Sequence, residues 1–147
     1  NGPVVLEDDG QQTLVFADTP ASAIYAYDYD GKTGNAGPRR LFADTSQLGG
    51  MPDGACADAD GGVWGCVLGS GKIARHKDGV VDEIVDTGVE LPSDVTFGGA
   101  DLSRMYFVSI AVSLPEIEVT SPNAGALMVV DGTSYTGRVE PRFRLSD

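Results

Sequence analysis

Short runs of alternating or β-branched apolar residues cover most of the chain, and most of them end at turns rich in glycine. Such runs predict β-strands, because successive side chains of a strand point to opposite faces of a sheet. No window keeps helical spacing for three turns, so no long helix is expected. The predicted strands are residues 13–18, 23–30, 39–44, 54–59, 62–68, 72–77, 80–86, 94–99, 104–110, 125–132 and 138–145.

An internal repeat favours a β-propeller among the all-β folds. Residues 1–18, 53–66 and 93–109 each contain a short apolar strand, a turn with glycine, and a second strand with an aromatic residue. These segments begin about 40–50 residues apart, which is the length of a four-stranded propeller blade. A sandwich explains the strands but not this register. Because propellers close with four to eight blades, the chain is expected to supply about half of a ring.

One long connection interrupts the last predicted blade. Residues 111–126 contain two prolines and no strong period, and they separate the second and third strands of that blade. A connection longer than about 12 residues in a compact domain is usually functional or mobile. We expect it to cover the rim of the propeller.

The charge balance narrows the range of partners. The 147 residues are enough for one domain, and 22 Asp and Glu against 10 Lys and Arg give a formal net charge of −12. This charge argues against nucleic acid and anionic membranes, and it leaves cations and small neutral or polar molecules. No apolar run approaches the ~20 residues of a membrane span, and no signal peptide is recognisable. The expected location is the cytoplasm.

The two cysteines are expected to be reduced. Cys56 and Cys66 flank a predicted turn at Asp60 and Gly61. A two-residue turn places Cys56 opposite Gly65, so the sulfurs are out of register for a bridge and we expect two half-buried thiols. No CxxC spacing supports a thiolate zinc site.

Several short stretches match known binding or catalytic motifs in part, but the surrounding sequence lacks what each motif requires. Residues 69–74 fit G-x-G-x-x-A, but a strand rather than a helix follows them. Residues 27–34 and 58–62 resemble parts of an EF-hand loop without its acidic ligands, so they are predicted to be hairpin turns. His76 is the single histidine and is expected to be solvated, which argues against Ser-His-Asp chemistry.

Three polar residues head the repeat units: Asn1, Asp53 and Ser93. Because the first strand of each blade lines the central channel, their oxygens are expected to point toward one axis. Amide and carboxylate oxygens without His or Cys are typical of a site for Ca²⁺, Mg²⁺ or Mn²⁺. Taken alone, Asp53 after a proline is explained better as a turn residue, and only the shared register of the three positions favours a metal ligand. A further acidic ligand would have to come from missing blades.

Three segments of the chain resemble the SMP-30/gluconolactonase/regucalcin family. They are "IYAYDYD" with the following "TG" and "RRLF", "PDGACADADGGVW" at 52–64, and "FGGADLSRMY" at 97–106. The resemblance covers most of residues 1–132. It implies a six-bladed β-propeller with one divalent cation in the channel, and it implies that residues 1–147 are the C-terminal half of one domain. The blades are then approximately residues 1–50, 51–91 and 92–147.

The same resemblance implies roles for individual residues. The family's Asn metal ligand falls on Asn1, and its Asp ligand, also the proposed catalytic base, falls on Asp53. Ser93 falls where the family often has a small hydroxyl residue near the channel, and the neighbouring Asp94 could support the ligands without binding the cation itself. Ordinary turn chemistry explains both residues at least as well. The family's third ligand, a Glu, and its substrate-contacting Arg and Asn residues belong to blades that the chain does not contain. The substrate-binding residues therefore stay unassigned.

The implied activity is lactone hydrolysis by a carboxylic ester hydrolase. The cation, calcium or alternatively zinc, magnesium or manganese, would polarise the carbonyl of a sugar lactone while Asp53 activates water. Missing N-terminal blades or a second chain would have to close the ring, so we expect the chain alone to be inactive. The alternatives are a calcium-binding propeller without turnover, a metal-dependent phosphoesterase on the same scaffold, and an interaction scaffold.

Overall fold

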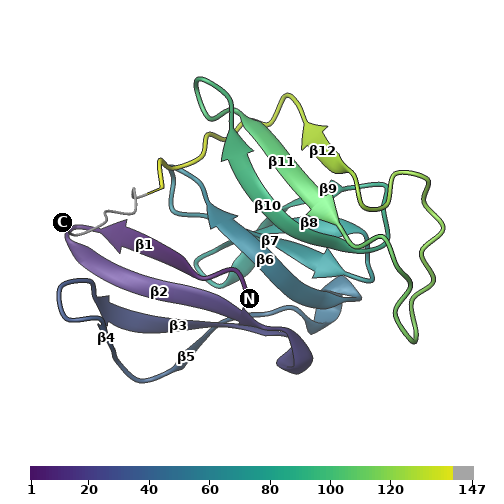
Figure 1. Ribbon diagram of the computed structural model, residues 1–147. Coiled ribbons are helices and arrows are strands. Elements are labelled where there is room, and N and C mark those ends of the chain that lie inside the picture. The colour runs from purple at the N-terminus through teal and green to yellow at the C-terminus, as the bar shows by residue number, and fades with distance from the viewer. Residues whose placement is uncertain (141–147) are drawn as a thin grey trace, which may run out of the picture.

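The computed structural model describes residues 1–140, which form three antiparallel sheets arranged like a fan (Figure 1). The first contains β1 (Val4–Asp8), β2 (Gln11–Asp18), β3 (Ala23–Asp30), β4 (Asn35–Ala36) and β5 (Arg40–Asp44). The second contains β6 (Met51–Ala57), β7 (Val63–Leu68), β8 (Lys72–Lys77) and β9 (Val80–Asp86). The third contains β10 (Pro92–Gly98), β11 (Arg104–Ser109) and β12 (Leu127–Val130). Single 3₁₀ turns, η1 (Thr19–Ala21) and η2 (Ser46–Leu48), lie in connections.

The arrangement confirms the predicted all-β propeller fold. Each sheet begins with its innermost strand, and its second and third strands follow outward in chain order. In the first sheet β4 and β5 both pair with β3. The three first strands, β1, β6 and β10, lie next to one another at the centre of the fan (Figure 1). The chain is therefore part of a propeller ring. Of the predicted strand at 138–145, residues 138–140 are not in a strand and the rest lies outside the described residues.

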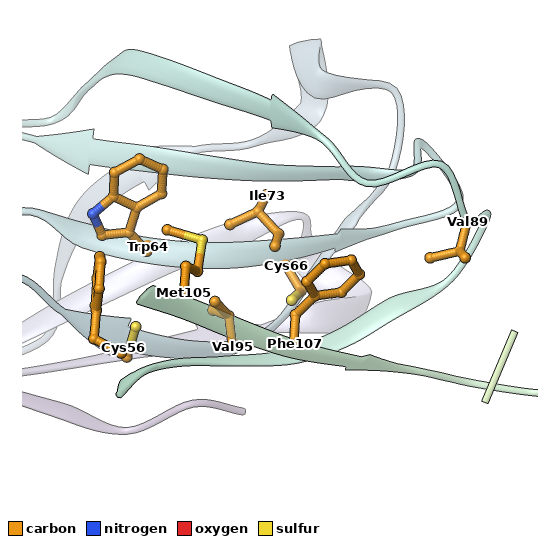
Figure 2. Packing of buried hydrophobic residues seen from close by; sticks show 9 residues of the cluster. Cys56, Trp64, Cys66, Ile73, Val89, Val95, Met105 and Phe107 are labelled. Carbon is orange, nitrogen blue, oxygen red and sulfur yellow. The ribbon is translucent and has the colours of Figure 1, made fainter. Parts of the chain in front are cut away.

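Two apolar clusters join the sheets. One lies between the second and third sheets (Figure 2). In it the rings of Trp64 and Phe97 meet edge to face, with their centroids 6.1 Å apart. The other lies between the first and second sheets and contains Val4, Val15 and Val63. The second sheet is thus covered on both faces, and every residue of β7 is buried. Burying one large apolar side chain stabilises a fold by about 1.5–3 kcal/mol, so these two clusters hold the neighbouring sheets together.

A buried carboxylate organises the turn between β6 and β7. Asp58 Oδ1 accepts hydrogen bonds from the amides of Asp60 at 3.0 Å and Gly62 at 2.8 Å. Its Oδ2 accepts from Trp64 Nε1 at 2.9 Å and from Arg75 Nε at 2.6 Å. Burial alone would raise the pKa of Asp58, but these donors, Arg75 foremost, hold it below its usual value. The prediction of a hairpin turn at 58–62 is confirmed.

The cysteine register predicted from a two-residue turn is wrong. The Asp58 amide donates to the Gly62 carbonyl at 2.9 Å, so the turn is longer and Cys56 lies opposite Trp64. Both thiols are free, as expected, but they are fully buried in the cluster of Figure 2. Burial raises the pKa of Cys56 to about 12. A thiol with so high a pKa is a packing group and a poor nucleophile.

Glu90, in the connection between β9 and β10, holds the long connection at 111–126 in place. Oε1 of Glu90 accepts from the Thr120 hydroxyl at 2.7 Å, the Thr120 amide at 2.9 Å and the Ser121 amide at 3.0 Å. These bonds, that of the Thr120 hydroxyl first, lower the pKa of Glu90 to about 2. The connection projects from the ends of the sheets at which β6 and β10 begin (Figure 1). A fixed segment therefore borders this end of the propeller.

The expectation that His76 is solvated is wrong. Its side chain is 1% exposed on β8, because the first sheet covers one face of the second and β9 covers its outer edge. Among the described residues Nδ1 has no hydrogen-bond partner. Burial lowers the pKa of His76 to about 4, against a small opposing effect of Asp82.

A buried neutral histidine predicts a specific acid sensitivity. Because the pKa of His76 is about 4 in the folded chain and about 6.5 unfolded, the unfolded state binds more protons between these values. The contribution of neutral His76 to the free energy of unfolding is therefore complete above pH 6.5. About 3 kcal/mol of this free energy is lost as the pH falls toward 4. Urea unfolding of wild type and of His76→Leu between pH 4 and pH 6.5 measures this loss of stability. The difference between the two curves should change with pH in this window, and parallel curves would contradict the prediction.

Candidate metal site

The first two residues approach the second sheet very closely. Gly2 has φ of +54°, and a Cβ there would lie 2.8 Å from the Cβ of Ala55 and 2.9 Å from the carbonyl carbon of Gly54. Real Cβ atoms do not come so close to backbone, so glycine is required at this step. The result is that Asn1 lies at the start of β6 as well as at the start of its own sheet.

Asn1 is held by β2. Its carbonyl accepts from the Ala17 amide at 2.8 Å, and its own backbone nitrogen donates to the Ala17 carbonyl at 2.7 Å. The side-chain Nδ2 donates to the Thr19 hydroxyl at 3.3 Å. Since the amide nitrogen is engaged, the amide oxygen is the atom left for a ligand.

Asp53 lies at an irregular step of β6. The register shifts between Pro52 and Ala55, which is a β-bulge, and bulges redirect side chains near functional sites. Partial burial raises the pKa of Asp53 and the charge of Asp94 adds to this, while the neighbouring Asn1 side chain lowers it. The structure therefore brings the side chains of Asn1 and Asp53 together.

Ser93 does not join them. It lies in a second bulge, between Pro92 and Asp94, and its hydroxyl donates to the Val108 carbonyl of its own sheet at 3.4 Å. The carboxylate of the next residue, Asp94, lies against the bare Cα of Gly54 instead. The register of the sequence repeat identified Ser93, but the repeat does not reveal the bulge beside it or the bond of its hydroxyl to the Val108 carbonyl.

The donor set suits a hard cation but is incomplete. Within residues 1–140 no group of three or more His, Cys, Asp or Glu side chains could hold a metal ion. Asn1 and Asp53 offer an amide oxygen and a carboxylate, the donor types that Ca²⁺ prefers, whereas Ca²⁺ takes six to eight oxygens. The two residues fit part of such a site, and their role as ligands stays a prediction.

The family model described as the SMP-30/gluconolactonase/LRE-like region matches residues 1–111. The chain belongs to this family. It is 34% identical over 137 residues to regucalcin of Xenopus laevis, covering 90% of this chain and 45% of that protein. It is 32% identical over 140 residues to pentonolactonase XacC of Haloferax volcanii, covering 91% of this chain and 47% of that protein. The chain thus spans about half the length of the curated relatives that it matches.

Solved structures agree on the fold. A regucalcin from Agrobacterium tumefaciens, described as a calcium-binding protein, superposes with a TM-score of 0.84 at 27% identity, over 99% of this chain and 49% of that one. A luciferin-regenerating enzyme gives a TM-score of 0.89 at 22% identity, over 99% of this chain and 48% of that one. At that identity the second match speaks for the fold alone. Among the described residues, no helix is long and apolar enough to span a membrane.

Proposed function

We propose that the protein, with its ring complete, hydrolyses sugar lactones with one divalent cation at Asn1 and Asp53. The observation that carries the proposal is the meeting of these two side chains at the inner ends of adjacent blades. The family supports it, since a pentonolactonase is among the relatives. A calcium-binding regucalcin among the solved structures favours Ca²⁺.

The chain's own contribution to the reaction is a positioned base. Asp53 takes a proton from the water that attacks the carbonyl carbon of the lactone. The ring carbon–oxygen bond then breaks, and the departing oxygen takes up a proton to give the hydroxy acid. The Asn1 side chain lies beside the Asp53 carboxylate and acts to lower the pKa of that carboxyl, which favours its basic form. When bound, the cation would supply Lewis-acid polarisation of the carbonyl.

The outer faces of the half ring indicate what is missing. Val5 of the first sheet is 37% exposed, and Leu127 and Val129 of the third are 70% and 46% exposed. Apolar sheet faces of this kind need a cover. We expect N-terminal blades or a second chain to pack on both faces, to close the channel, and to bring the remaining acidic ligand and the residues that contact the sugar.

The test is hydrolysis of a panel of sugar lactones, measured as the acid released at constant pH. Turnover with Ca²⁺ that stops when a chelator is added, and returns when the ion is restored, is the expected result. A protein that binds Ca²⁺ but hydrolyses no lactone would be a calcium-binding propeller, the alternative that the regucalcin relatives favour. Cleavage of phosphoesters without cleavage of lactones would also overturn the proposal.

A further inference from the structure

A small cavity lies between the first and second sheets, beside the bare Cα of Gly65. Gly65 is the middle residue of a row of small residues across the second sheet, with Ala55 opposite it on β6 and Ala74 opposite it on β8. A Cβ at position 65 would have no neighbour nearer than the Cβ of Ala55, at 4.0 Å. The volume of the cavity is about 10 Å³, which is about the room that one water molecule needs.

His76 and Asp53 bring polar side chains to this cavity. His76 lies opposite Val63, a member of the cluster between the first and second sheets, so its ring faces the first sheet. Asp53 borders the cavity from β6. Cys66 also borders it, but its thiol belongs to the cluster on the other face of the second sheet (Figure 2). The rest of the described lining is apolar side chains and glycine, so a small polar ligand here has His76 and Asp53 as its side-chain partners.

The imidazole of His76 needs a partner that the described residues do not supply. Its side chain is 1% exposed, and Nδ1 makes no hydrogen bond within residues 1–140. Burial lowers the pKa of His76 to about 4, so the ring is uncharged at neutral pH. Each nitrogen of a neutral imidazole either donates or accepts, and leaving it unpaired in the interior destabilises the fold in both cases. A water molecule both donates and accepts, so it pairs with Nδ1 in either tautomer.

We propose that this cavity binds one water molecule, which bridges Nδ1 of His76 to the carboxylate of Asp53. The bridge makes His76 a positioning residue, because a carboxylate that is hydrogen-bonded to a fixed group keeps its orientation. This role rests on the proposed function of Asp53 as a base, whereas the water site does not depend on that function.

Gly65→Ala tests the water site without changing either side chain that binds the water. Gly65 does not have a positive φ, so alanine fits the strand and its methyl group fills the cavity. In the ring-complete protein this change should lower the urea midpoint of unfolding, because it leaves His76 Nδ1 unpaired. In a His76→Leu background it should raise the midpoint, because the methyl group then replaces glycine without leaving the imidazole unpaired.

Gly37→Ala is the matched control, at an exposed position without a positive φ, where a Cβ meets Asp28 at 3.5 Å. It should have the same small effect in both backgrounds. A high-resolution crystal structure of the ring-complete protein should show one water within hydrogen-bond distance of His76 Nδ1 and of the Asp53 carboxylate. The same structure of Gly65→Ala should show no water at this place.

Lactone kinetics at saturating cation test the positioning role. Gly65→Ala and His76→Leu should each lower kcat about tenfold and leave KM nearly unchanged, since both remove the bridge to Asp53. His76→Gln, whose amide group also binds water, should recover part of the loss.

The outcomes separate the water site, the positioning role and the proposed function. A cavity without water, with Gly65→Ala raising the urea midpoint in both backgrounds, would overturn the water site and leave the lactonase proposal standing. Wild-type kcat in both Gly65→Ala and His76→Leu would overturn the positioning role of His76. If the ring-complete wild type hydrolyses no lactone, the positioning role falls with the proposed function, while the crystal structures and the unfolding midpoints decide the water site on their own.

Discussion

Asp58→Ala is expected to lower the free energy of unfolding by about 3–5 kcal/mol, because it removes the buried one of the two carboxylates that pair with the Arg75 guanidinium. Four donors converge on the Asp58 carboxylate, and both side chains of the pair are almost fully buried. Arg75 keeps its second partner, Asp82, and its contact with the Tyr135 ring at 4.4 Å. Asp82 lies at the partly exposed edge of the site and cannot replace the bonds to the turn and to Trp64.

Urea unfolding, monitored by circular dichroism, measures this loss. Circular dichroism is preferred to the fluorescence of Trp64, because the substitution itself removes the hydrogen bond of Trp64 to Asp58. Asp60→Ala is the matched control, since it removes the same charge from an exposed position two residues along the same turn. It should change stability by less than about 0.5 kcal/mol. A loss below about 1 kcal/mol for Asp58→Ala would mean that the pair contributes no more than a surface salt bridge.

The strands could be predicted from the sequence because apolar and polar residues alternate along strands of all three sheets. β3, β8 and β9 span the predicted residues, since each is bounded by turn residues and carries a clear run. Burial was harder to predict. The charged segment of β8 contains Arg75 and His76, which suggests a solvated strand, yet both are buried because sheets cover both faces and Asp58 pairs with the arginine. Such pairing joins residues far apart in the chain and has no local signal.

In the candidate site, too, some features could be predicted from the sequence and others could not. The proximity of Asn1 and Asp53 could be predicted because the two residues occupy equivalent positions in a repeat, and a repeat in a propeller is also a repeat around an axis. The direction of the Ser93 side chain could not be predicted, because it depends on the extra residue of a bulge. The cysteine register failed for a related reason, since Asp58 holds a turn longer than the two residues that Asp-Gly suggests. β-Bulges and turn lengths decide which way a side chain points, and the alternation of apolar and polar residues does not reveal them.

Asp53→Asn is expected to lower the rate of lactone hydrolysis by about 10²–10⁴-fold, the range that a positioned general base contributes. Asparagine keeps the size of the side chain and one oxygen donor but cannot accept the proton from water. The loss should therefore fall on kcat at saturating cation, with a smaller change in KM. The removal of charge should also weaken cation binding, so each assay needs a separate titration to show that the ion is bound.

Asp86→Asn is the matched control, because it makes the same change at an exposed position on the outermost strand of the same sheet. It should retain wild-type kcat and cation affinity. Since Asp53 packs beside Gly54 and Asn1 in a close backbone contact, folding of Asp53→Asn must be checked by its unfolding midpoint. A folded, cation-loaded Asp53→Asn that hydrolyses lactone at nearly the wild-type rate would show that another group, supplied by the remaining blades, activates the water.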